Sequence, residues 1–75
     1  MNFNKDKPAL LDVSTRGKRR KAVAGIIELL KEIREAEEGY MTRMPENLQS
    51  GDAYAVADNS VDVIIEAVDL LSDAY

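Results

Sequence analysis

The side chains of this chain that could carry acid–base or metal chemistry are carboxylates, because the sequence contains neither histidine nor cysteine. The clearest pattern is two pairs with a spacing of three residues, Glu32 with Glu35 and Glu66 with Asp69. Residues three apart share one face of a helix, and Mg²⁺ binds where several carboxylate oxygens converge. Two such pairs on facing helices would supply the oxygen ligands of a divalent cation.

On these four residues the chain resembles the all-α nucleotide pyrophosphohydrolases of the MazG type, in which such pairs hold magnesium. The resemblance implies a metal-dependent nucleotide hydrolase as one alternative. The helix register described below turns Glu66 and Asp69 away from the first helix, which favours a solvated acidic face instead. The serines have no histidine to activate them, and no glycine-rich phosphate loop occurs. We therefore predict that the protein is not an enzyme and uses no cofactor or metal.

A run of basic residues is the strongest candidate for binding a partner. Contacts to nucleic-acid phosphates need little more than clustered positive charge, so nucleic-acid binding is one alternative function. The run has no interleaved aromatic residues that could stack on bases, and a solvated helix start is the other interpretation. The run consists of Arg16, Lys18, Arg19, Arg20 and Lys21.

The rest of the chain is acidic. Residues 1–21 hold seven basic and two acidic side chains, whereas residues 22–75 hold three basic and twelve acidic ones. A stripe of carboxylates along a helix can imitate the phosphates of DNA, as in small phage-encoded inhibitors of DNA-binding enzymes, and this is a further alternative. The stripe consists of Asp58, Asp62, Glu66, Asp69 and Asp73.

Two helices must position these residues. Residues 1–14 read as an N-terminal arm, partly disordered or with one short helical turn, and residues 15–75 as one helical domain. The first helix is expected over about 15–41, with Ser14 or Thr15 as its N-cap. Pro45 ends it, and Ser50 or Asp52 caps a second helix over about 52–74.

Apolar residues recur along both helices at alternating steps of three and four, which predicts an antiparallel two-helix hairpin. In this register Arg19 would lie on the ring of Tyr75. The predicted contact line of the second helix is Tyr54, Ala57, Val61, Ile64, Val68, Leu71 and Tyr75. That of the first helix is Ala22, Ile26, Leu29, Ile33, Ala36 and Tyr40.

A hairpin leaves further apolar residues outside this line, and chains this short need a disulfide, a metal, dense packing or a second chain. We therefore predict a homodimer that forms a four-helix bundle. Two alternatives stay open: Phe3, Leu10, Leu11 and Val13 could fold back over the stripe in a monomer, or another protein could cover it. The predicted association residues are Ile27, Leu30, Val56, Val63, Ile65 and Leu70.

The turn is the other distinctive segment. Residues 44–49 read MPENLQ, and on this stretch the chain resembles small uncharacterised helical proteins of Gram-positive bacteria and their phages, over about residues 30–75. The resemblance implies a helical hairpin and no particular activity. Leu48 is expected to tuck under the helix ends, with Glu46, Asn47 and Gln49 bonding to unpaired backbone groups there. A solvent-facing binding loop is the alternative.

No run of 18 apolar residues occurs, so the sequence predicts no membrane span and a cytoplasmic protein. Taken together, these features predict a small helical protein that self-associates and serves as an interaction or scaffolding module.

Overall fold

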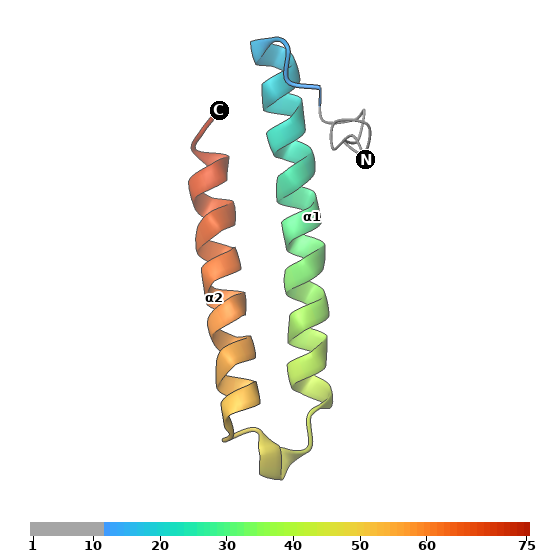
Figure 1. The fold of residues 1–75 in the computed structure, drawn as a ribbon, viewed down its shortest axis with the longest axis vertical. Coiled ribbons are helices and arrows are strands. Elements are labelled where there is room, and N and C mark those ends of the chain that lie inside the picture. Colours follow the sequence, from blue (N-terminus) through green and yellow to red (C-terminus); the bar gives the residue numbers. More distant parts are fainter. Residues whose placement is uncertain (1–11) are drawn as a thin grey trace, which may run out of the picture.

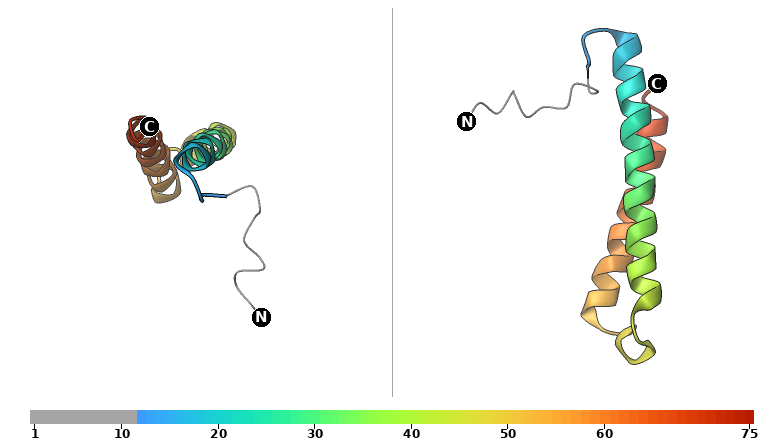
Figure 2. Two further views of the ribbon diagram at one scale, coloured as in Figure 1. Left: turned by 90° about the horizontal axis from the view of Figure 1, so that it is seen from above. Right: turned by 90° about the vertical axis from the view of Figure 1, so that its right-hand side faces the viewer.

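A computed structural model, which describes residues 12–75, shows an antiparallel pair of α-helices (Figure 1). Helix α1 spans Arg16–Arg43, the short 3₁₀ helix η3 spans Glu46–Leu48, and helix α2 spans Asp52–Ser72. No strand occurs within the described residues. The views in Figure 2 confirm that the two helices lie side by side along their length. The all-α hairpin predicted from the sequence is therefore confirmed.

Helix α1 begins at the predicted cap. Thr15 is the N-cap, and its Oγ1 accepts a hydrogen bond from the backbone N–H of Lys18 at 3.1 Å. The helix continues two residues beyond the predicted end, to Arg43, and Met44 adopts the extended conformation that a following proline requires. Pro45 thus ends the helix, as predicted.

Replacing Thr15 with alanine is expected to destabilise the fold by about 0.5–2 kcal/mol, because a first-turn amide would lose its acceptor. Urea unfolding, with the chain concentration held constant, measures this difference. Thr15→Ser keeps the hydroxyl and serves as the matched control, which should unfold close to the wild type. Equal stability of the alanine and serine variants would contradict the capping role.

The turn differs from the prediction at two points. Leu48 is 52% exposed, so it does not tuck under the helix ends. Gly51, rather than Ser50 or Asp52, is the N-cap of α2, and no side chain caps that helix. Gly51 N–H donates to the Leu48 carbonyl, and a Cβ at position 51 would lie 3.3 Å from that oxygen, so the close approach favours glycine.

One of the three predicted capping side chains in the turn makes such a contact. Gln49 Nε2 donates to the carbonyl oxygen of Met44, the C-cap residue of α1, at 3.1 Å. For Glu46 and Asn47, no side-chain hydrogen bond to a described residue is present. Gln49 therefore ties the turn to the end of α1.

The contact line of α2 is confirmed over its helical length. Ala57 and Val61 are buried, and Tyr54, Ile64, Val68 and Leu71 are half-buried. Met41 of α1 joins Ala57 and Val61 in the core, with Tyr54 packed against them. The six α2 residues form the face of this helix that packs on α1.

The predicted contact line of α1 is wrong by one residue. Ile26, Leu29, Ile33, Ala36 and Tyr40 are exposed, and only Ala22 of that line is buried. A shift of one residue corresponds to a rotation of about 100° about the helix axis. The residues that are buried or half-buried at heptad spacing are Val23, Ile27, Leu30, Arg34, Glu37, Met41 and Met44.

The rotation puts two charged residues, Arg34 and Glu37, into the contact line between the helices. Arg34 Nε is buried, has no hydrogen-bond partner among residues 12–75, and lies 3.7 Å from Glu38 Oε1. Among the described residues only four apolar side chains are buried, and no large side chain is fully buried. A single hairpin therefore has a very small core.

Candidate functional site

The most prominent feature of the surface is a continuous apolar face on one side of the hairpin. Each of its residues comes directly before a contact-line residue in the sequence, on α1 and on α2 alike. In an antiparallel pair of helices, the residues that come directly before the two contact lines lie on the same side of the pair. All are exposed, with Leu29 at 56% and Val56 and Leu70 each at 66%. We call this set the apolar face: Ile26, Leu29, Ile33 and Tyr40 from α1, and Val56, Val63 and Leu70 from α2.

A hollow between the helices shows that the two flanks share one side. It has a volume of about 390 Å³ and brings Tyr40 of α1 together with Val56 of α2. Smaller residues extend the apolar character, because Ala36 on α1 and Ala53 and Ala67 on α2 occupy equivalent positions. The apolar face therefore runs across both helices.

A second hollow, of about 460 Å³, extends this face to the turn. Tyr40, Asp52 and Ala53 line both hollows, and Leu48, Met44 and Pro45 add apolar walls at the turn. Arg43 and Asp52 are the charged residues of its lining. The exposed Leu48 thus belongs to the same apolar surface as the helices.

The six predicted association residues lie at three different places on the hairpin. Val56, Val63 and Leu70 lie on the apolar face. Ile27 and Leu30 do not, because both are half-buried in the contact line with α2. Ile65 follows the contact line of α2 by one position and lies on the opposite side. Sequence reasoning placed Ile26, Leu29, Ile33 and Tyr40 inside the hairpin and so missed their exposure.

The opposite side of the hairpin is charged. Lys31 pairs with Glu28 at 3.3 Å, and Glu35 and Glu38 continue this flank of α1. Asp58, Asp62 and Asp69 occupy the matching flank of α2, with Ile65 as the large apolar residue among them. The hairpin is therefore amphipathic as a unit, with one apolar and one charged side.

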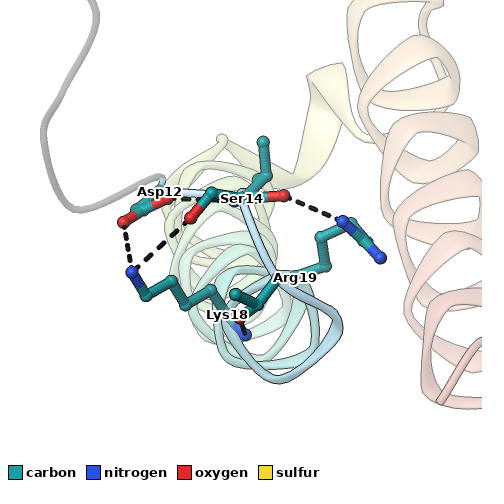
Figure 3. Close-up of polar contacts among 6 residues, drawn as sticks. Asp12, Ser14, Lys18 and Arg19 are labelled. Carbon is teal, nitrogen blue, oxygen red and sulfur yellow. Dashed lines mark hydrogen bonds and ion pairs between the residues drawn. The ribbon is translucent and has the colours of Figure 1, made fainter.

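The basic run surrounds the start of α1 rather than forming one face. At 100° per residue, its five positions are spread around the helix. Figure 3 shows Lys18 reaching back to Asp12 and Ser14, while Arg19 lies on the side nearer α2 and donates to the Val13 carbonyl at 3.0 Å. Arg20 and Lys21 have no ion pair or hydrogen-bonded side-chain partner within residues 12–75.

Arg16, and not Arg19, stacks on Tyr75. Its guanidinium carbon lies 4.8 Å from the centre of the ring. The difference follows from the rotation of α1, because Arg16 continues the observed contact line and Arg19 continues the predicted one. Three of the five basic residues therefore already contact groups of the same chain.

Asp12 is held ionised by this local network. Its Oδ1 accepts from the Ser14 backbone N–H at 3.0 Å, and its Oδ2 lies 3.0 Å from Lys18 Nζ. The Ser14 backbone hydrogen bond first, and then the Lys18 side chain, lower the pKa of the Asp12 carboxyl from 3.8 to about 2. The carboxylate thus anchors the entry segment to the first turn of α1.

We expect the Asp12 carboxyl to titrate with a midpoint near 2 when followed by NMR. Because its pKa is lowered in the folded chain, the contact with Ser14 and Lys18 is complete above pH 4 or so and is lost as the pH falls through the folded pKa. Ser14→Pro removes the donating N–H and should move the midpoint toward 3.8. A wild-type midpoint near 4 would contradict the network.

The paired carboxylates are not brought together. Among the described residues, no three acidic side chains come close enough to hold a metal ion. Glu32 and Glu35 are exposed on α1, and Glu66 and Asp69 are exposed on α2. The geometry that the resemblance to MazG-type hydrolases would require is therefore absent from residues 12–75.

Within residues 12–75, neither helix is long and apolar enough to cross a membrane. Comparison with protein-family models, with curated proteins and with solved structures gives no match. The resemblance of the turn segment to small helical proteins of Gram-positive bacteria and phages stays a prediction.

Proposed function

We propose that the protein is a non-enzymatic scaffolding module that works by self-association, two copies packing their apolar faces together into a four-helix bundle. The observation that carries this proposal is the apolar face, whose seven large side chains are all exposed in the single hairpin. Contiguous exposed apolar surface of this kind marks an interaction site in a folded protein. Its cytoplasmic location stays a prediction.

A second copy suits this face better than other occupants do. The hairpin alone lacks a core of adequate size, since only four apolar side chains are buried among the described residues. In a four-helix bundle each helix needs apolar residues toward two neighbours, and α1 has two adjacent apolar stripes, one of them on α2 and one exposed. A second hairpin supplies an identical apolar face and completes the core of both copies at once.

The rotation of α1 supports the same conclusion. A hairpin that had to be stable alone would gain by burying Ile26, Leu29 and Ile33 against α2, since that stripe contains no charge. Instead, the half-buried stripe includes Arg34 and Glu37. Both stripes are buried only when a second layer of helices covers the apolar face.

Two alternatives to self-association are also decided by the test below: the N-terminal arm folding back over the apolar face, and nucleic-acid binding. Of the arm residues proposed to fold back, Phe3, Leu10 and Leu11 lie outside the described residues, and Val13 is exposed. Nucleic-acid binding has weaker support, because Arg16, Lys18 and Arg19 already contact groups of the same chain. Phosphate binding would also show a steep loss of affinity with salt, which apolar packing does not.

Exchange of subunits between two labelled populations tests the proposal. The chain has no cysteine, so Asp62→Cys on the charged side introduces a single labelling site. Donor-labelled and acceptor-labelled chains mixed at micromolar concentration should show energy transfer, which excess unlabelled wild type should abolish. Chains that also carry Leu29→Glu are the control and should show none. Absence of transfer between otherwise wild-type chains would contradict the proposal.

A further inference from the structure

We infer that the second copy docks with its α2 over α1 of the first, so that both turns lie at the same end of the bundle. This inference deepens the proposed self-association and rests on it. Two apolar faces related by a two-fold axis can meet in two ways. Either α1 packs on the partner's α2 with the turns together, or α1 packs on the partner's α1 with the turns at opposite ends.

The edges of the apolar face carry charges that distinguish the two arrangements. Along the outer edge of α2, Asp52, Asn59, Glu66 and Asp73 recur every seven residues, so this edge is acidic. The edge of α1 is basic at both ends of the helix, with Lys18 near its start and Arg43 as its last residue. Glu32, near the middle of α1, is the one acidic residue on that edge.

With the turns together, residues at the same end of the hairpin meet across the interface. Arg43 ends α1 and Asp52 begins α2, and both line the hollow at the turn, so each Arg43 would face the Asp52 of the other copy. At the far end, where Arg16 stacks on Tyr75 within each hairpin, Lys18 would face Asp73, the C-cap of α2. The two-fold axis doubles both contacts, and all four combine opposite charges.

With the turns at opposite ends, the same residues meet like charges. The start of α1 would then lie on the end of the other α1, so Lys18 would oppose Arg43. Likewise, the start of α2 would lie on the end of the other α2, so Asp52 would oppose Asp73. Charges near an interface act mainly on its register and orientation. Exposed pairs change affinity only a few-fold each, but four attractive contacts replace four repulsive ones.

The local surroundings leave these charges available. Within residues 12–75, no ion pair involves Arg43, Asp52 or Asp73, and Lys18 pairs with Asp12 while its side chain stays half exposed. Lys18, Arg43, Asp52 and Asp73 are all exposed. The turns-together arrangement gives each of them a partner of opposite charge, and it places the two basic runs at one end of the bundle.

The distance between two spin labels at the turn decides between the arrangements. Asn47→Cys carries the label, and Asp62→Cys, at the middle of α2, is the matched control because its distance is short in either arrangement. With the turns together, the labels at position 47 should lie roughly 20–35 Å apart. With the turns at opposite ends they would be separated by more than about 40 Å, since the 28 residues of α1 span about 42 Å.

Each outcome has a distinct meaning. A short distance at both sites supports the inference. A short distance at position 62 with a long one at position 47 overturns the inference and leaves the proposed self-association intact. No dipolar coupling at either site overturns the proposed function itself.

Charge reversal gives an independent test, because it should change the affinity of the dimer in opposite directions in the two arrangements. Asp73→Lys should weaken the dimer a few-fold if Asp73 faces Lys18, and adding Lys18→Glu should restore it. With the turns at opposite ends, Asp73→Lys alone would tighten the dimer, because it would place a cation opposite Asp52. A tighter Asp73→Lys dimer therefore overturns the inference.

Discussion

A chain carrying Val63→Glu and Leu70→Glu is expected to scatter light as a monomer of 8.3 kDa under conditions where the wild type is a dimer. Both residues lie on the apolar face, exposed by 53% and 66% in the single hairpin. Packing of a second copy would remove about the exposed half of each side chain from water, worth about 1–2 kcal/mol per residue. Because two residues in each of two chains change, the dimer should lose about 4–8 kcal/mol, a weakening of roughly a thousandfold or more.

The matched control is Ile65→Glu. Ile65 is an apolar residue of the same helix, two positions from Val63, and it is 38% exposed on the charged side. Introducing glutamate there should leave the molar mass at the dimer value. Circular dichroism of all variants checks that the helices persist. A dimeric Val63→Glu, Leu70→Glu chain, or a monomeric Ile65→Glu chain, would show that the apolar face is not the interface.

The second large effect is expected within the hairpin, at Ala57. This alanine is 2% exposed, the lowest value in the described core, and it belongs to one buried cluster with Val61 of its own helix and Met41 of α1. Ala57→Leu adds three carbon atoms at a residue that packs with Met41 where the two helices touch, so the helices must separate near the turn. Overpacking of this kind costs about 1–3 kcal/mol, which should lower the melting temperature by several degrees in a chain of this length.

Ala55→Leu is the matched control for this substitution. Ala55 is exposed on α2, two residues from Ala57, so the same change should alter stability by less than about 0.5 kcal/mol. Thermal unfolding at equal chain concentration compares the two, because the stability of a dimer depends on concentration. Equal melting temperatures of the two variants would contradict the observed packing of α2 on α1.

The face with which α2 packs could be predicted from the sequence, whereas that of α1 could not. In α2 the contact line from Tyr54 to Leu71 alternates steps of three and four without a polar residue, and it was identified correctly. In α1 two apolar stripes run side by side, one through Ile26, Leu29 and Ile33 and one through Val23, Ile27 and Leu30. Periodicity alone favours the first stripe, because the second continues into Arg34 and Glu37.

The same ambiguity explains why half of the apolar face was missed. Val56, Val63 and Leu70 were identified because α2 has one obvious contact line and they lie outside it. Leu29 and Ile33 were assigned to the interior of the hairpin, although the breadth of the apolar arc on α1 already indicated two packing partners. Which stripe faces which neighbour depends on the arrangement of the helices and not on the residues of one helix.

The helix ends and the turn show which local features can be predicted from the sequence and which cannot. Thr15 and Pro45 act locally, through one hydroxyl and one fixed φ angle, and both effects were predicted. The N-cap role of Gly51 depends instead on the approach of its backbone to Leu48, which the residue types around it do not reveal. Likewise, the contact of Arg16 with Tyr75 follows from the rotation of α1.

The most direct test of self-association through the apolar face is the molar mass of the wild-type chain by light scattering at micromolar concentration. One chain has a mass of 8.3 kDa, and the expected result is twice that value. The dimer mass should persist at high salt, because apolar packing holds the copies together. A mass of 8.3 kDa that does not change with concentration would contradict the account, since the apolar face would then be covered within a single chain.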